Sequence, residues 1–351
     1  MKENWLIKMS LSVQKLTQDL ECKWNEYALN SGASIYHDSR WIPLIKKVFG
    51  HDSHHILALE EGVVVGILPL VQLKSRLFGN FLVSMPYFNY GGAIANNKVI
   101  ESKMMQTAIE VALESGAEHI EFRDTDIREE AWPVRKDKVN MILELPDTAE
   151  LLGKAIGAKK RSQIRRPLKE GVESIIGGAE LLDDFYQVFS INMRDLGTPV
   201  YAKTFFLEML KTFPEQVKIV ILRLNGKPIS AAFLIGFKEQ LEIPWASTLK
   251  EYNRFSPNML LYWEVLKLAI ESGYRKFDFG RSSIDSGTYR FKKQWGAVPK
   301  QLYWHYWLAE GKEMPQLTPD NTKYKVAINV WQHLPTFVTN KLGPVIIKSL
   351  P

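Results

Sequence analysis

The sequence predicts a mixed α/β fold built from two similar halves. Apolar runs separated by a polar–Gly turn occur twice, at 56–72 and 220–237, and such a turn between strand-like runs is typical of a β-hairpin. The segments ESGAEHIEF (114–122) and ESGYRKFDF (271–279) each place a glycine between a helical pattern and a strand. The composition, 46% hydrophobic and 24% charged, is that of a globular protein.

The two halves repeat one another in order along the chain. The alternative is that any α/β protein contains helix–Gly–strand units, and a solenoid is excluded because its units span about 20–50 residues. A duplicated domain explains the pattern better. The matched pairs, with separations falling from 165 to 157 residues, are Tyr36-x4-Trp41 with Tyr201-x4-Phe206, Gly62 with Gly226, Met85-Pro86-Tyr87 with Ile243-Pro244-Trp245, and the two ESG segments.

Each half is expected to run helix, hairpin, strand, helix, strand. In the second half, Ser256 is expected as the N-cap and Pro257 as the first residue of a helix with apolar residues at a helical period over 259–270. Gly273 is expected to end that helix, and residues 277–279 then alternate as a strand. Ligands of such folds bind where strand ends and helix N-termini meet.

Charge and cysteine content limit the function classes. The 45 Lys and Arg residues exceed the 39 Asp and Glu residues by 6, which is too small an excess to indicate nucleic-acid binding by itself. The single cysteine, Cys22, fits a reducing compartment. No apolar run of about 18 residues occurs, and charges interrupt the N-terminus, so we expect neither a membrane span nor a signal peptide. These features predict a cytoplasmic protein.

Four runs resemble a known family, and the resemblance extends over nearly the whole chain. The runs are GILPLVQLKSRLFGNFLVSMPYFNYGG (66–92), SPNMLLYWEVLKLAIESGYRKFDFGRS (256–282), YRFKKQWGAVP (289–299) and WQHLPTFVTNKLGP (331–344). They resemble tandem GCN5-related N-acetyltransferase (GNAT) folds, as in the FemAB/FemX peptidyltransferases, and most closely the FemAB-related proteins of bacterial exosortase/PEP-CTERM (exopolysaccharide) systems. The resemblance implies two tandem GNAT-like domains of α/β class with mixed sheets.

The resemblance implies an enzyme, an acyltransferase that forms an amide. We expect it to act on an amine of a cell-envelope precursor, of the exopolysaccharide or peptidoglycan type. The donor would be an aminoacyl-tRNA, as in the FemAB group, or an acyl-CoA, as in other GNAT relatives. Two alternatives stay open: an acyl-CoA-dependent N-acyltransferase of an amino sugar, and a non-catalytic module that binds a glycan precursor or assembles an export complex.

The repeat and the resemblance predict three parts. Residues 1–150 form an N-terminal GNAT-like domain expected to bind the acceptor, and residues 151–310 form a C-terminal domain expected to be catalytic. Residues 311–351 form a tail whose apolar stretch, 338–347, is too short to span a membrane. We expect the tail to pack on the domain or to contact a partner, and peripheral membrane association stays open.

The strongest candidate site lies in residues 278–293. Acyl transfer needs hydrogen-bond donors for the oxyanion and a group that takes the amine proton. Asp278 and Gly280 end a strand, where a carboxylate orients an amine and a glycine lets a ligand approach the backbone. By resemblance to the F-K motif of FemX-like proteins, Lys292 after Phe291 is expected to stabilise the oxyanion or the departing ester oxygen. The catalytic candidates are thus Lys292, Asp278 and Phe291, with Tyr289 and Gly280 beside the substrate and Arg281 as its anion clamp. In the alternative, Asp278 pairs with Arg281 or Arg290 and only holds a loop.

Two further segments are candidate anion sites. Arg254, Ser256 and Asn258 surround a helix start, where free N–H groups and the helix dipole attract anions. The corresponding loop of CoA-using GNAT proteins is glycine-rich, whereas Pro257 and Met259 stand here, which argues against acyl-CoA. The second segment is the basic run 154–169, which is either a solvated face or a contact for tRNA, a nucleotide-linked precursor or an anionic membrane. Its named candidates are Lys159, Lys160, Arg161, Arg165 and Arg166.

The first half supplies a candidate acceptor pocket. Tyr87, Asn89 and Tyr90 precede paired glycines and suit a sugar-sized or nucleotide-sized ligand, although a packed strand end with a tight turn explains them equally. By family analogy, Arg40 and Trp41 could border that pocket. No metal site is expected, because adjacent histidines in HDSHH (51–55) would point to opposite faces of a strand. No cofactor is assigned with certainty, and acyl-CoA or aminoacyl-tRNA would enter as the donor substrate.

Overall fold

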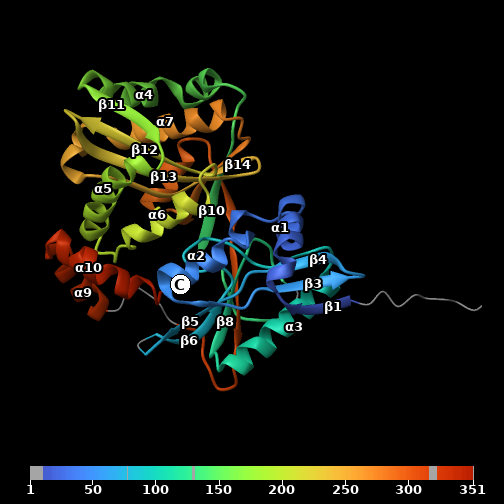
Figure 1. Cartoon of the computed structure of the whole chain (residues 1–351). Coiled ribbons are helices and arrows are strands. Elements are labelled where there is room, and N and C mark those ends of the chain that lie inside the picture. Colours follow the sequence, from blue (N-terminus) through green and yellow to red (C-terminus); the bar gives the residue numbers. More distant parts are fainter. Residues whose placement is uncertain (1–10, 77, 129–130, 316–321, 351) are drawn as a thin grey trace, which may run out of the picture. The chain divides into compact units, whose positions relative to one another are not determined.

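The computed structural model describes residues 11–76, 78–128, 131–315 and 322–350. It confirms a mixed α/β fold (Figure 1). The chain forms two compact units, and neither is continuous in sequence. The first comprises residues up to Lys136 with Leu302–Met314, and the second comprises Asp137–Gln301 with Pro315–Leu350. These units differ from the sequential parts expected to end at residues 150 and 310.

The first unit contains two sheets, with strand orders β1-β3-β4-β7 and β2-β5-β6-β8-β17-β9. Its elements are β1 (Leu11–Lys15), η1 (Gln18–Leu20), α1 (Glu21–Asn30), η2 (Ile35–His37), α2 (Trp41–Phe49), β2 (Asp52–Ser53), β3 (Ile56–Glu60), β4 (Val63–Leu68), β5 (Val71–Ser75), β6 (Gly79–Val83), β7 (Ile94–Ala95), α3 (Lys98–Ser115), β8 (His119–Asp124), β9 (Val134–Arg135) and β17 (Tyr303–Leu308).

Alternation along β3 builds two small cores on opposite faces of its sheet. Ile56 and Ala58 pack in the cluster that includes residues of α3, whereas Leu57 packs in the cluster that includes Trp24 of α1. This is the two-residue period of a strand covered on both faces. Figure 1 shows α1 and α3 on either side of β3 and β4.

The second unit is one seven-stranded sheet with helices on both faces, in the strand order β11-β12-β13-β14-β15-β10-β16. Figure 1 shows α4 and α7 on one face and α5 and α6 on the other. Its elements are β10 (Lys138–Glu144), α4 (Ala149–Lys169), β11 (Val172–Gly177), η3 (Ala179–Leu181), α5 (Leu182–Asp195), α6 (Lys203–Thr212), β12 (Val217–Leu224), β13 (Lys227–Phe237), β14 (Gln240–Thr248), η4 (Lys250–Phe255), α7 (Pro257–Glu271), β15 (Lys276–Ser283), α8 (Gly287–Lys293), β16 (Val298–Gln301), α9 (Thr322–His333) and α10 (Thr336–Ile347).

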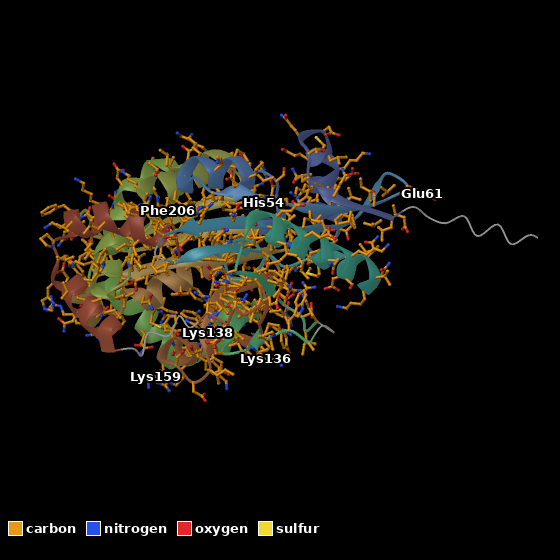
Figure 2. The ribbon with its side chains drawn as sticks, turned by 90° about the horizontal axis from the view of Figure 1, so that it is seen from below. His54, Glu61, Lys136, Lys138, Lys159 and Phe206 are labelled. Atoms are coloured by element: carbon orange, nitrogen blue, oxygen red, sulfur yellow. The ribbon has the colours of Figure 1, made fainter. Side chains whose placement is uncertain are left out.

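The internal repeat is a structural repeat. Both predicted hairpins form, β3–β4 and β12–β13, and in each the two turn residues have positive φ: 53° and 80° at Glu61-Gly62, 50° and 74° at Asn225-Gly226. Such turns match the twist of the paired strands, and Figure 2 marks the first one at Glu61. After each hairpin follow two parallel strands joined by a helix, β6–α3–β8 and β14–α7–β15.

The prediction for α7 is confirmed, and α4 is a helix with a kink. Pro257 is the first residue of α7, and Gly273 follows its end with φ +81°. Pro167 lies two residues before the end of α4, which runs on to Lys169, and the helix is kinked at Gly157, where φ is +83°. A proline this close to the last turn removes one hydrogen bond only, whereas a left-handed residue interrupts the helix path.

The two halves exchange their last strands. β10 follows the first half in sequence but lies between β15 and β16 in the second unit, paired with both in antiparallel register. β17 follows the second half but lies between β8 and β9 in the first unit. Each sheet is therefore completed by a strand from the other half of the sequence. A cut at a single residue cannot separate the two units.

A buried ion pair on β8 helps to hold β17 in the first unit, because side chains of both strands contact it. The Arg123 Nε–H donates to Glu121 Oε1 at 2.7 Å, and the Tyr306 hydroxyl donates to Glu121 Oε2 at 2.5 Å. Burial would by itself raise the pKa of the Glu121 carboxyl, but the Arg123 charge and these hydrogen bonds hold it below its ordinary value. The guanidinium also stacks 4.4 Å from the ring centre of Trp304 on β17.

Replacing Glu121 with Gln should lower the free energy of unfolding at pH 7 by about 3 kcal/mol, since it leaves Arg123 buried without its counter-charge. Because the folded pKa of Glu121 is depressed, its contribution is complete above the unfolded pKa near 4.5 and is lost as pH falls below it. Urea unfolding at pH 7 and pH 4 measures the difference. Equal destabilisation at both pH values would contradict this account.

A fragment of residues 1–150 should fail to fold, because it lacks β17 and therefore the central strand between β8 and β9. It also carries β10, whose two partner strands are missing. Far-UV and near-UV circular dichroism of the purified fragment, with the full chain as reference, tests this. A native-like near-UV spectrum and a cooperative thermal transition would show that the strand exchange is dispensable.

Candidate functional site

Strands β14 and β15 pair over three residues and then diverge. The parallel register runs from Gln240–Lys276 to Glu242–Asp278, after which β14 continues beside β13 alone and β15 beside β10. A bulge at Ile243 and Pro244 accompanies the change, where β14 shifts register against β13. Proline has no N–H and is tolerated at a bulge. The sequence thereby places two buried carboxylates, Glu242 and Asp278, as neighbours at the divergence point.

A second bulge shapes the β15 side of this point. Asp278 pairs with Ile142 and Arg281 with Asn140, so Phe279 and Gly280 oppose a single residue of β10. Gly280 has φ +73°, a conformation that glycine adopts without strain. Its N–H donates to Asp278 Oδ1 at 2.7 Å. Asp278 is fully buried, so its position is fixed.

Lys292 is brought to this bulge by α8. Its ammonium donates to the carbonyl oxygens of Gly280 and Arg281, both at 2.9 Å, and its side chain is buried. Burial lowers the pKa of Lys292 to about 8, although the nearby carboxylates of Asp278 and Glu242 act in the opposite direction. An ammonium has three N–H donors. Lys292 therefore keeps one donor and a proton that is transferable near neutral pH.

Two residues of this cluster were missed by the sequence analysis. Glu242 interrupts the apolar strand of Leu241 and Ile243, and a lone charge on a buried strand was a signal that could have identified it. Asn140 comes from β10, and its Nδ2 donates to Asp278 Oδ2 at 3.0 Å. Nothing in the sequence relates residue 140 to residue 278, because the strand exchange alone brings them together.

The side-chain amide of Asn140 uses its N–H donor, but its oxygen has no hydrogen-bond partner among the described residues. The residue is buried, and its Oδ1 accepts no hydrogen bond from any described residue. An uncompensated buried acceptor costs about 1–3 kcal/mol. A substrate amine or hydroxyl could satisfy it, so Asn140 joins Lys292 as a group that offers an unused hydrogen-bonding position at the divergence point.

The start of α7 lies beside α8. Gln294, just after α8, approaches Met259 Sδ at 3.8 Å, and Tyr262 packs edge-on against Phe291 with ring centres 4.9 Å apart. Ser256 occupies the N-cap position with φ +60° and makes no side-chain cap hydrogen bond. Thus the second-half candidates converge on one region of the second unit, where β15, α7 and α8 meet.

The side chains of the remaining second-half candidates differ in exposure. Arg254 and Arg281 are exposed and Asn258 is half-buried, whereas Tyr289 and Phe291 are packed against the hydrophobic core. Tyr289 N–H is capped by Ser286 Oγ at 3.1 Å, which fixes the start of α8. Tyr289 and Phe291 thus hold the helix that carries Lys292.

The basic run forms an exposed helix face. Lys159, Arg165 and Arg166 are exposed on α4, and Figure 2 labels Lys159. Arg161 and Lys160 are half-buried and turn back onto the helix, with Arg161 Nη1 donating to the Gly153 carbonyl at 2.7 Å and Lys160 Nζ donating to the Ile156 carbonyl at 3.2 Å. The other face packs against α7 through Ile164 and its neighbours.

The first-half candidates lie around a tightly held loop after β6. Tyr87 has φ +73°, and its hydroxyl lies 2.9 Å from His51 Nε2. Asn89 accepts the Trp304 indole N–H at 3.1 Å through its carbonyl, and Tyr90 is buried with its ring edge-on to Tyr36 at 5.5 Å. Tyr87 and Asn89 keep part of their surface exposed.

Arg40 and Trp41 lie at the N-terminal end of α2. Arg40 is bound to Asp38, with Nε donating to Oδ1 at 2.9 Å and Nη2 to Oδ2 at 2.8 Å. The Trp41 ring is fully buried against Phe88, and its indole N–H donates to the Ile35 carbonyl at 2.9 Å. Trp41 therefore has no exposed surface to offer a ligand and acts in the core of the first unit.

The matching divergence point of the first unit is filled by its own chain. β6 and β8 pair only through Leu82–Ile120 and Val83–Glu121, so Glu121 corresponds to Asp278. There the Gly91 and Gly92 N–H groups both donate to the Arg123 carbonyl, at 3.1 and 3.0 Å, and the Arg123 side chain donates to the Met85 and Phe88 carbonyls. Among the described residues, the unused donor of Lys292 and the unused acceptor of Asn140 have no counterpart at Glu121.

Part of the chain matches a known domain family. Residues 158–293 match the family model described as an acetyltransferase (GNAT) domain, which contains α7, β14, β15 and α8. The crystal structure of FemX has a TM-score of 0.64 at 14% identity, covering 84% of this chain and 96% of that one. The comparison with curated protein sequences found no match.

Two further solved structures share the fold. The structure of L-PGS from Bacillus licheniformis has a TM-score of 0.56 at 12% identity and covers 92% of this chain and 99% of that one. A tandem GNAT protein from the clavulanic acid biosynthesis pathway has a TM-score of 0.53 at 11% identity and covers 87% and 100%. The predicted GNAT fold is confirmed. The matched acetyltransferase domain supports an acyltransferase.

The buried Lys292 gives a testable pH dependence of stability. Its folded pKa of about 8 lies below the unfolded value of 10.5, so the folded state binds fewer protons between these values and gains stability as pH rises through them. Relative to Lys292→Met, the wild type should therefore become more stable between pH 7 and pH 9.5, by on the order of 1–2 kcal/mol. Urea unfolding measures this, with Lys293→Met, an exposed neighbour, as the control. Parallel pH profiles of wild type and Lys292→Met would refute the buried-ammonium assignment.

Proposed function

We propose that this protein transfers an aminoacyl or acyl group from an activated donor to an amine of a cell-envelope or exopolysaccharide precursor, and that the second unit carries out the reaction. The observation that carries the proposal is the cluster of Lys292, Asp278, Glu242 and Asn140 at the divergence of β14 and β15. It combines a transferable proton, two buried carboxylates and an unused amide oxygen within a GNAT-type domain.

The cluster supports amide formation without a covalent enzyme intermediate. The acceptor amine attacks the donor carbonyl, and Asn140 Oδ1 orients the amine by accepting one of its N–H groups. The remaining N–H of Lys292 stabilises the oxyanion and then protonates the departing ester oxygen, to which a pKa near 8 is suited. Glu242 takes the proton that the amine loses. Asp278 holds the Gly280 bulge and Asn140 in place and is a positioning residue.

The start of α7 favours an ester donor such as an aminoacyl-tRNA over acyl-CoA. Pro257 and Met259 stand where glycines would allow close approach of a pyrophosphate, and both are buried. Ser256, just before them, adopts a left-handed conformation. The exposed cations of α4 supply the localised positive face that a tRNA backbone needs. The exposed Arg281 and Arg254 are the proposed contacts for phosphate or carboxylate groups of the substrates.

The acceptor is proposed to contact the loop after β6. Tyr87 and Asn89 expose part of their surface, and the loop is held rigid by Arg123, as a preorganised contact for a sugar-linked precursor requires. Because chain atoms fill the divergence point of the first unit, we place the donor in the second unit only.

The first experiment identifies the donor. The purified protein should modify amines of the precursor with one donor, aminoacyl-tRNA, and not with the other, acetyl-CoA. Aminoacyl-tRNA and acetyl-CoA are each incubated with an envelope precursor extract, and products are detected by mass spectrometry. An aminoacyl mass increment with aminoacyl-tRNA supports the proposal. An acetyl increment with acetyl-CoA would replace the donor assignment, and precursor binding without turnover by either donor would leave a binding module.

Lys292→Ala should lower the transfer rate by at least about 100-fold, in the range that general acid and oxyanion groups supply. The wild-type rate should fall above pH 8 as Lys292 loses its proton. The exposed Lys293→Ala serves as the matched control and should keep the wild-type rate and pH profile. A Lys292→Ala variant with the wild-type rate would overturn the catalytic assignment.

A further inference from the structure

The C-terminal helices α9 and α10 dock rigidly on the second unit. Gln332 Nε2 donates to the Asp195 carbonyl at 3.0 Å, and Arg194 Nη1 donates to Thr336 Oγ1 at 2.9 Å. Gly197 approaches Ile328 so closely that a β-carbon there would lie 2.4 Å from it. The expectation that the tail packs on its domain agrees with these contacts, which hold α10 against α5 (Figure 1).

Docking leaves one face of α10 outward, and that face is not polar. Thr339 and Gly343, one helical turn apart, face the domain and are buried. Phe337, Lys341, Val345 and Lys348 follow one another at helical spacing on the other side, and all are exposed. The exposed fractions of Phe337 and Val345 are 76% and 62%. An exposed phenylalanine between aliphatic and lysine side chains is unusual for a solvated helix.

Two more apolar side chains of these two helices are exposed. Leu342 of α10 is 46% exposed and Val330 of α9 is 58% exposed. From residue 327 to residue 350 the sequence contains no Asp or Glu, whereas Lys341 and Lys348 are both present. We call this set the tail surface: Val330, Phe337, Lys341, Leu342, Val345 and Lys348.

We propose that the tail surface binds an anionic lipid membrane, with α10 lying in the plane of the interface. Apolar side chains interleaved with lysines are the composition of interfacial helices, whose apolar groups enter the boundary between headgroups and acyl chains while the ammonium groups meet lipid phosphates. At 12 residues, α10 is about 18 Å long, which suits a surface position. Among the described residues, no helix combines the length and apolar character of a membrane span.

Other occupants fit the tail surface less well. A second copy of the chain would bring Lys341 and Lys348 towards their own counterparts, with no acidic residue on this segment to offset the repulsion. A nucleic acid needs closely spaced phosphate contacts, and these are offered by α4 rather than by a face that presents more aliphatic than cationic groups. The lipid surface is the partner that uses both the apolar and the cationic side chains.

The experiment is co-sedimentation of the full chain with vesicles. Vesicles of 30% phosphatidylglycerol in phosphatidylcholine are compared with pure phosphatidylcholine vesicles at about 0.1 M salt. We expect the wild type to bind the anionic vesicles, and Phe337→Glu with Val345→Glu to lower the partition coefficient at least tenfold. Lys341→Gln with Lys348→Gln should remove the preference for anionic vesicles. Thermal denaturation confirms that each variant is folded.

The matched control is Leu113→Glu, since Leu113 is 62% exposed on α3 and lies outside the tail surface. It should bind the vesicles as the wild type does. Absence of wild-type binding to anionic vesicles, or undiminished binding by the Phe337→Glu/Val345→Glu variant, would overturn the proposal. Sedimentation equilibrium adds a third test: a wild-type dimer that this variant abolishes would assign the surface to a second copy instead.

Discussion

Strands β10 and β17 each complete a sheet made mainly by the other half of the chain. A sheet lacking an inner strand would leave two rows of backbone N–H and C=O groups unpaired, at a cost of about 1–3 kcal/mol for each buried group. Neither half therefore has a complete hydrogen-bonded core by itself. The buried side chains that matter most, Asn140 beside Asp278 and Tyr306 on Glu121, arrive on these exchanged strands.

The repeat gives the same backbone position two different uses. In the first unit Glu121 is satisfied by Arg123 and Tyr306, and the loop after β6 closes over it. In the second unit Asp278 accepts from Gly280 and Asn140, while Lys292 keeps an unused donor and a lowered pKa. A position whose hydrogen bonds are all made stabilises the fold, and one that retains unused groups can act on a substrate. This asymmetry is why we assign chemistry to the second unit.

Two exposed surfaces of the second unit also differ in kind. On α4, the exposed cations Lys159, Arg165 and Arg166 outnumber the exposed Leu168 near them, whereas the tail surface has more phenylalanine, leucine and valine than lysine. Phosphate backbones and lipid interfaces select for these two compositions respectively. A transferase that took its donor from a charged polymer and its acceptor from a membrane-bound precursor would use both surfaces.

Local patterns in the sequence determined the elements: the hairpin turns at Glu61-Gly62 and Asn225-Gly226, the start of α7 at Pro257, and the repeat itself. These depend on φ preference and on periodicity, which short segments carry by themselves. The sequence also indicated Asp278, Gly280 and Lys292, which lie within 15 residues. It could not place Asn140 beside Asp278 or withdraw Trp41 into the core. Those outcomes depend on which strand pairs with which and on packing across long sequence separations, and only the tertiary structure decides them.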